Sequence, residues 1–315
     1  MMIVHDVHKT ASSGTINSLT REKAESEQII NAFEDFESEN DAVTVHPLTV
    51  VSPYATIHED VFNLAKEKQL AMIFLPYHKQ LAVDGRLQDE NHSLKEINKN
   101  ILVNPPCSVG ILVDRGLRSS IRSDSVNRPE LRFAMLFIGG SDDQEALSYA
   151  WKMAGTHGVI LSVIRFLASK EAEQIIMPEV EKDEEGILTA ATETERAREY
   201  DDEFMNEFRF KTMCAESIIY HEKLVNGSDE VVECIATKYN NFDLYIVGRG
   251  ERAKSPITMA LSEWSSESPE LGLIGETLVS SQFTHRVSVL VVQQAAVVGL
   301  RTGSSRHKGK CRRKN

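Results

Sequence analysis

Short apolar runs alternate with amphipathic stretches along the first third of the chain. A run of consecutive apolar residues predicts a buried strand, and apolar residues three and four apart predict one face of a helix. The predicted strands are residues 2–7, 43–51, 70–75 and 109–113, and the predicted helices are residues 21–37, 57–68 and 93–103. Strands that alternate with helices favour a parallel sheet with right-handed crossovers.

The same alternation begins again after a polar stretch at residues 115–130, which predicts a linker. The predicted strands beyond it are residues 133–138, 159–166, 217–224, 244–247 and 287–292, and the predicted helices are residues 142–156, 196–210 and 229–239. Residues 168–195 are rich in Asp and Glu and predict a flexible surface excursion. The repeated order predicts an α/β protein with two tandem Rossmann-like parallel-sheet domains.

The domain boundaries follow from the linker and from the charge of the chain. We predict a first domain at residues 1–114, a second at residues 131–294, and a basic, disordered tail at residues 295–315. The formal net charge is −12 although this tail is basic. An acidic body repels phosphates, so we expect no nucleic-acid partner.

The hydropathy pattern excludes ion transport by this chain alone. No stretch approaches the roughly 18 to 20 continuous apolar residues that span a bilayer. The first ten residues, MMIVHDVHKT, predict no signal peptide because no basic region precedes an apolar one. We therefore expect this chain to be soluble, with no intramembrane carboxylate to carry a proton.

The sequence offers no catalytic or metal site. The cysteines are scattered without metal-ligand spacing, which fits a reduced chain in the cytosol. Ser217 stands in an apolar strand without the glycines of a nucleophile elbow. We expect no enzymatic activity, no metal and no obligatory cofactor.

Four ordered segments resemble the soluble tail of the plant cation/H+ exchanger family of monovalent cation/proton antiporters. They are VTVHPLTVVSPYATIHEDVFNLAKEKQLAMIFLPYHKQ, NPPCSVGILVDRG, AMLFIGGSDDQEALSYAWKMAGTHGVILSVIRF and DLYIVGRG…SPITMALSEWSSESPELGLIGETLVSS…VSVLVVQQ. The resemblance implies two universal-stress-protein-like domains, of which the first lacks its opening strand–helix unit. It also implies a regulatory region of a K+/H+ antiporter in cation and pH homeostasis. The implied partner is a membrane domain, and the implied place is the cytoplasmic side of an endomembrane or the plasma membrane.

A glycine turn gives an alternative function as an adenine-nucleotide sensor. Gly248-Arg249-Gly250 follows a predicted strand, and Ser255 and Gly272 stand near predicted helix starts. Such turns present backbone N–H groups to phosphate, so ATP or another adenine nucleotide could bind there. The glycine spacing departs from the nucleotide-binding pattern of universal stress proteins, and Leu273 replaces its hydroxyl residue. A structural turn with two capped helices explains the same residues.

Two further hypotheses stay open. His58 and His78 lie in segments that resemble the antiporter tail, and histidine changes charge near neutral pH, so a pH-sensing role suits them. They could equally be ordinary structural histidines. A dimerising scaffold is the third function, in which two copies pair through exposed sheet edges or their last strands.

Overall fold

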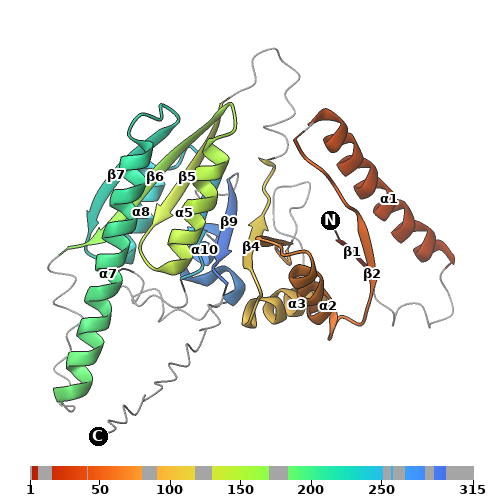
Figure 1. Cartoon of the computed structure of the whole chain (residues 1–315), viewed down its shortest axis with the longest axis horizontal. Coiled ribbons are helices and arrows are strands. Elements are labelled where there is room, and N and C mark those ends of the chain that lie inside the picture. Colours follow the sequence, from red (N-terminus) through yellow and green to blue (C-terminus); the bar gives the residue numbers. More distant parts are fainter. Residues whose placement is uncertain are drawn as a thin grey trace, which may run out of the picture.

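The fold consists of two sheets and the helices that cover them (Figure 1). A computed structural model describes residues 2–5, 16–40, 42–79, 91–117, 130–169, 184–250, 257, 267–280 and 287–295. We call residues up to 117 the first half and residues from 130 onward the second half. The linker centre, Ser255 and the tail beyond residue 295 lie outside the described residues.

The larger sheet has seven strands in the order β3-β4-β9-β8-β5-β6-β7. They are β3 (Met72–Pro76), β4 (Ser108–Val113), β5 (Leu131–Phe137), β6 (Val159–Ala168), β7 (Ile218–Val225), β8 (Leu244–Gly248) and β9 (Ser288–Gln293). All neighbours are parallel except β4 and β9. The predicted α/β class is therefore confirmed.

The two halves share this sheet, which corrects the expectation of two separate parallel sheets. The last strand of the first half, β4, runs antiparallel to the last strand of the second half, β9, from Val109 opposite Gln293 to Val113 opposite Val289. Both strands are buried almost throughout, so each completes the core of the other. The last strands thus pair inside one chain, and this pairing does not need a second copy.

A separate two-stranded parallel sheet holds β1 (Met2–His5) and β2 (Leu48–Val51). The helices are α1 (Ile16–Glu39), α2 (Ile57–Glu67), α3 (His92–Val103), α5 (Ser141–Ala154), α7 (Glu184–Thr212), α8 (Ser228–Lys238) and α10 (Gly272–Ser280), with the short 3₁₀ helix η2 (Pro269–Leu271). Because α7 begins at Glu184, the excursion predicted for residues 168–195 is partly helical. None of the described helices is long and apolar enough to cross a membrane.

Two apolar clusters, one on each face of the large sheet, form the core. On one face α5 and α7 pack through residues such as Leu147, Met205 and Phe208. On the other face α2, α3, α8 and α10 contribute Val61, Ile101, Val231 and Ile274. Helices from both halves therefore pack against the large sheet. This packing fixes where the turns after β5, β8 and β3 lie.

Candidate functional site

The predicted glycine turn lies at the carboxyl end of β8, directly against the N-terminus of α5. A Cβ atom on Gly248 would stand 2.4 Å from Oδ1 of Asp143 and 2.5 Å from its backbone nitrogen. Only glycine therefore lets the strand approach the helix this closely. Gly250 follows with a φ of +76° and no atom within 4 Å of its would-be Cβ, so it is a turn residue beside open space.

Carboxylates already hold the backbone amides of this turn. Asp143 accepts from the N–H of Gly248 at 2.8 Å, and from those of Ile138 and Gly139 at 2.7 and 2.8 Å. Asp142 accepts from the N–H of Gly250 at 3.1 Å and from Gln294 N–H at 2.8 Å. The two aspartates thus occupy the backbone N–H donors that a phosphate would use.

Burial sets the ionisation of these carboxyls. It raises the pKa of Asp143 from 3.8 to about 7, against the three backbone hydrogen bonds that lower it, and nearby Asp201 raises it further. Burial likewise raises the pKa of Asp201, although hydrogen bonds from Gln144 and Gly140 oppose the rise. The Nε2 group of Gln144 donates to Asp201 at 2.7 Å, and the N–H of Gly140 does so at 3.0 Å. Burial therefore favours the protonated form of both carboxyls beside the turn after β5.

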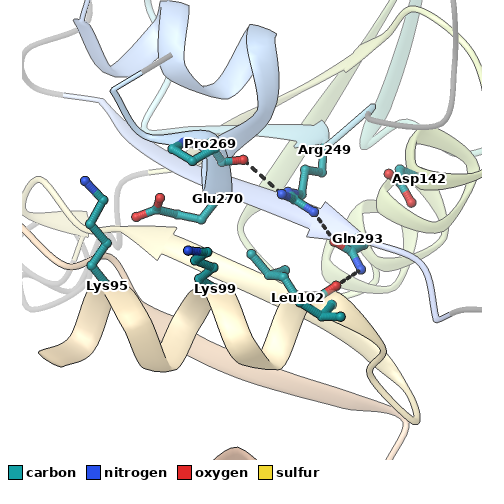
Figure 2. A pocket seen from close by; sticks show the side chains of 9 residues that line it. Lys95, Lys99, Leu102, Asp142, Arg249, Pro269, Glu270 and Gln293 are labelled. Carbon is teal, nitrogen blue, oxygen red and sulfur yellow. Dashed lines mark hydrogen bonds between the residues drawn. The ribbon is translucent and has the colours of Figure 1, made fainter. Parts of the chain in front are cut away.

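Arg249 points back across the sheet rather than outward from the turn. Its Nη1 donates to Oε1 of Gln293 at 2.6 Å and its Nη2 donates to the Pro269 carbonyl at 3.0 Å. Gln293 in turn donates to the Leu102 carbonyl at 2.9 Å (Figure 2). Gly272, with a φ of +64°, comes so close to Arg249 that a Cβ would meet the Arg249 carbonyl oxygen at 2.0 Å. The structure thus brings Gly248, Arg249, Gly250 and Gly272 together.

A pocket of about 490 Å³ opens beside Arg249, between the two halves of the chain. Its charged groups are mixed in sign, because three basic side chains and two acidic ones surround it (Figure 2). The pocket is lined by Lys95, Lys99, Leu102, Val103, Asp142, Arg249, Pro269, Glu270 and Gln293. Its size suits a small organic ligand.

A set of polar contacts joins the first half to the second, and we call it the seam. Four pairs define it: Tyr77 with Ser268, His78 with Glu270, Lys95 with Glu267, and Leu102 with Gln293. The Tyr77 and Ser268 hydroxyls lie 2.7 Å apart, and Lys95 Nζ donates to the Glu267 carbonyl at 3.2 Å. Polar side chains therefore hold the two halves together along the seam.

The pair of His78 and Glu270 is the buried centre of the seam. Nδ1 of His78 bonds Oε1 of Glu270, and the two side chains are 0% and 3% exposed. His78 follows β3 and also lies against the Tyr77 ring, with 4.3 Å between ring centroids. The sequence pointed to His78 but not to Glu270, which follows Ser268 and Pro269. Nothing local in the sequence could place two residues this far apart in contact.

His58 lies apart from this pair, on α2. It is half-buried and its ring meets Phe62 edge-on, with 6.0 Å between centroids. Its Nδ1 has no hydrogen-bond partner among the residues that the structure describes. No contact described here joins His58 to His78 or Glu270. The described part of the chain also contains no cluster of three or more His, Cys, Asp or Glu that could hold a metal.

The relatives of this chain identify its class. Residues 130–293 match the plant cation/H(+) antiporter, C-terminal domain, and residues 1–117 match a plant cation/H(+) antiporter domain. The chain therefore belongs to the plant cation/H(+) antiporter family, which confirms the resemblance drawn from its sequence segments. Since its family is one of transporters, no catalytic activity is indicated.

Individual relatives agree with this assignment. The chain is 49% identical over 285 residues to cation/H(+) antiporter 23, chloroplastic, of Arabidopsis thaliana, covering 88% of this chain and 31% of that protein. It is 45% identical over 294 residues to cation/H(+) antiporter 15 of the same plant, covering 93% of this chain and 35% of that protein. The chain thus spans about a third of the length of the curated relatives it matches.

The fold also resembles a solved structure. It is similar to the crystal structure of a universal stress protein from Archaeoglobus fulgidus DSM 4304, with a TM-score of 0.41 and 13% identity. The match covers 93% of this chain and 85% of that one.

Proposed function

We propose that this chain is the regulatory region of a monovalent cation (K+)/H+ antiporter that acts in cation and pH homeostasis. Its family membership supports the proposal, as does its share of about a third of each relative's length. The partner of the region is the membrane domain of the full-length antiporter, which carries the ion pathway. The region works on the cytoplasmic side of an endomembrane or of the plasma membrane.

The buried pair of His78 and Glu270 carries the proposal, because it is a histidine–carboxylate contact between the two halves. Imidazole is the side chain that ordinarily changes charge between pH 5 and 8. When it is protonated, the contact is an ion pair, and when it is neutral, the carboxylate stays buried without its counter-charge. A buried carboxylate that loses its counter-charge is costly, so the two halves hold together less tightly as pH rises.

Other charged groups set the field around this pair. Lys95 and Lys99 approach from α3, and Arg249 approaches from the turn after β8. Glu276 accepts from the N–H groups of Glu267 and Ser268. A change in the tightness of the seam would favour one arrangement of the region over another. The membrane domain then responds to whichever arrangement it binds better.

The test compares two single variants of the purified chain. His78→Gln keeps a hydrogen-bond donor for Glu270 but cannot become charged, and His58→Gln is the matched control outside the seam. We expect the thermal midpoint of the unsubstituted chain to fall between pH 5.5 and 8, and His78→Gln to flatten part of that fall. His58→Gln should keep the full slope. An unchanged slope in His78→Gln would refute the pH-reading role of the pair.

The pocket beside Arg249 supports a second candidate, an adenine-nucleotide sensor at Gly248, Arg249, Gly250, Ser255 and Gly272. Lys95 and Lys99 supply positive charge next to the glycine turn. Asp142 and Asp143 count against it, since they hold the turn's amides. Titration calorimetry with ATP, AMP and cyclic nucleotides, with and without Mg2+, decides the matter. The sensor hypothesis is supported if a nucleotide binds and Lys99→Gln weakens that binding, whereas Lys238→Gln, at an exposed position, does not. The absence of any binding heat would refute it.

A further inference from the structure

The strand β7 forms one edge of the large sheet, at the end farther from β4 (Figure 1). The last strands β4 and β9 pair with each other inside the chain, so the edge strands of this sheet are β3 and β7. The inner side of β7 pairs in parallel with β6 from Ile218 to Val225. Among the described residues, no strand pairs with its outer side. Such an edge presents a row of backbone N–H and C=O groups that can accept another strand.

The backbone hydrogen bonds show which residues of β7 face outward. The N–H of Leu161 donates to the Ser217 carbonyl at 2.8 Å, and the N–H of Ser169 donates to the Val225 carbonyl at 2.9 Å. The odd-numbered residues of β7 therefore direct their backbone groups toward β6. Since these groups alternate in direction along a strand, the even-numbered residues of β7 direct theirs outward.

Exposed apolar side chains lie along the same edge. Leu224 is 65% exposed and Ile219 is 43% exposed, on opposite faces of the sheet. The side chain of Arg209 on α7 lies over the Tyr220 ring, 4.8 Å from its centroid, so this side of α7 is next to β7. Met213 stands one helical turn further along the same side and is 76% exposed. A strand that pairs with β7 would therefore cover apolar surface on both faces of the sheet.

The sequence of β7 is complementary to itself in one antiparallel register, in which His221 lies opposite His221 of a second copy. Ile218 then faces Leu224, and Tyr220 faces Glu222. Both pairs join outward-facing residues, so their N–H and C=O groups can exchange hydrogen bonds. Because facing side chains must lie on the same face of the sheet, the register changes only in steps of two residues. One step sets Glu222 against Glu222 and the other sets Glu222 against Ile218, and both are less favourable.

The charges around Glu222 suit this register. Within one chain the Tyr220 hydroxyl donates to Glu222 at 2.6 Å. The Nη1 atoms of Arg165 and Arg209 lie 3.9 and 3.8 Å from the same carboxylate oxygen. In the register described, the Glu222 carboxylate meets a second tyrosine hydroxyl rather than a second carboxylate. The pairing therefore places no uncompensated negative charge at the middle of the edge.

We propose that two copies of this chain associate through β7, with the two strands antiparallel, and join their seven-stranded sheets into one. The stem of Lys223 then packs over Ile219 of the second copy while its ammonium group reaches water. Every contact occurs twice about the twofold axis, so one substitution acts at both ends of the interface. The proposal selects one edge and one register for a dimer, and it does not depend on the pH-reading role of His78 and Glu270.

The first test measures the mass of the full chain by sedimentation velocity from low to high micromolar concentration. We expect the mass to rise from one chain to two. Leu224→Asp should raise the dissociation constant at least about tenfold, because it sets a charge against Ile218 at both ends of the interface. Phe74→Asp, at a 57% exposed position on the opposite edge strand β3, should leave the dissociation constant unchanged. Equal thermal midpoints at low concentration confirm that the variants are folded.

Two results of this measurement would overturn the proposal. One is the mass of a single chain at every concentration. The other is a dissociation constant that responds to Phe74→Asp and not to Leu224→Asp, because the copies would then associate through β3.

Engineered cysteines test the register itself. Facing residues in a non-hydrogen-bonded pair have Cα atoms about 4.5 Å apart, which is within disulfide range, and His221 is such a residue. In a chain that carries Cys214→Ser and Cys311→Ser, diamide should link His221→Cys into a covalent dimer. Ile219→Cys is the matched control on the same face, because its two copies lie four residues apart along the strands, roughly 13 Å. Equal linking at both positions, or no linking of His221→Cys where the chain is dimeric, would overturn the proposed register.

Discussion

Replacing Asp143 with alanine is the sharpest test of how the turns after β5 and β8 are held. The Asp143 carboxylate accepts three backbone N–H groups, at 2.7 to 2.8 Å, from Ile138, Gly139 and Gly248. Alanine leaves all three donors without an acceptor, and the Gly248 group is the buried one. An unsatisfied buried donor costs about 1–3 kcal/mol, and the partly exposed ones cost less because water reaches them. We therefore expect Asp143→Ala to lower the free energy of unfolding by about 2–4 kcal/mol at pH 5.

The size of this loss should depend on pH, with a sign that burial determines. Burial raises the pKa of Asp143 from 3.8 to about 7, so between about pH 4 and 7 the folded state binds more protons than the unfolded state. Stability therefore falls as pH rises through that window. At about 1.4 kcal/mol per pKa unit, the ionisation of Asp143 lowers the free energy of unfolding by about 3 kcal/mol between pH 5 and 8. The alanine variant lacks this contribution, so its disadvantage should largely vanish at pH 8.

Urea unfolding at pH 5, 6.5 and 8 measures both quantities, with equal slopes against urea as the check that each chain unfolds alike. Asp229→Ala is the control, because Asp229 is an exposed carboxylate in the first turn of α8. Its effect should stay within about 1 kcal/mol at every pH. A loss in Asp143→Ala that is the same at pH 5 and pH 8 would refute the link between burial and protonation at this position.

Two further predictions concern packing at the turn and thiol reactivity. Gly248→Ala should lower the free energy of unfolding by at least about 3 kcal/mol, because its Cβ would stand 2.4 Å from Asp143. Gly250→Ala should lower it by only about 1–2 kcal/mol, because its positive φ is the only cost. Equal losses for the two variants in urea unfolding would contradict this. Cys214 is exposed, whereas Cys107 is buried and burial raises the pKa of its thiol. Iodoacetamide should therefore label Cys214 first under native conditions, as followed by mass spectrometry. Modification of Cys107 first would show a different packing around β4.

The sequence was sufficient for local structure because apolar periodicity is a local signal. The runs at residues 244–247 and 287–292 predicted β8 and β9, and the structure confirms both. The sequence was not sufficient to predict which strands lie beside β8 and β9 in the sheet. A strand buried on both faces carries no mark of which strand lies beside it, so the antiparallel pairing of β4 with β9 could not be read from either run.

The candidate site was predictable only in part, for the same reason. The glycines after β8 were visible, but their purpose depends on α5 packing against that strand. Asp142 and Asp143 follow the Gly139-Gly140 turn in the sequence, but only the adjacency of β5 and β8 shows that they accept from the amides of the turn after β8. Glu270 reaches His78 through the folding of two halves onto one sheet, which no spacing in the sequence encodes.

The most direct test of the central claim is cation transport against pH by the full-length antiporter that contains this region. Vesicles carrying the unsubstituted protein, the His78→Gln variant and the His58→Gln variant are compared between pH 5.5 and 8. If the pair of His78 and Glu270 reads pH, His78→Gln should flatten or displace the pH profile of cation/H+ exchange, and His58→Gln should not. Superimposable profiles for all three proteins, at equal protein amounts, would contradict the account.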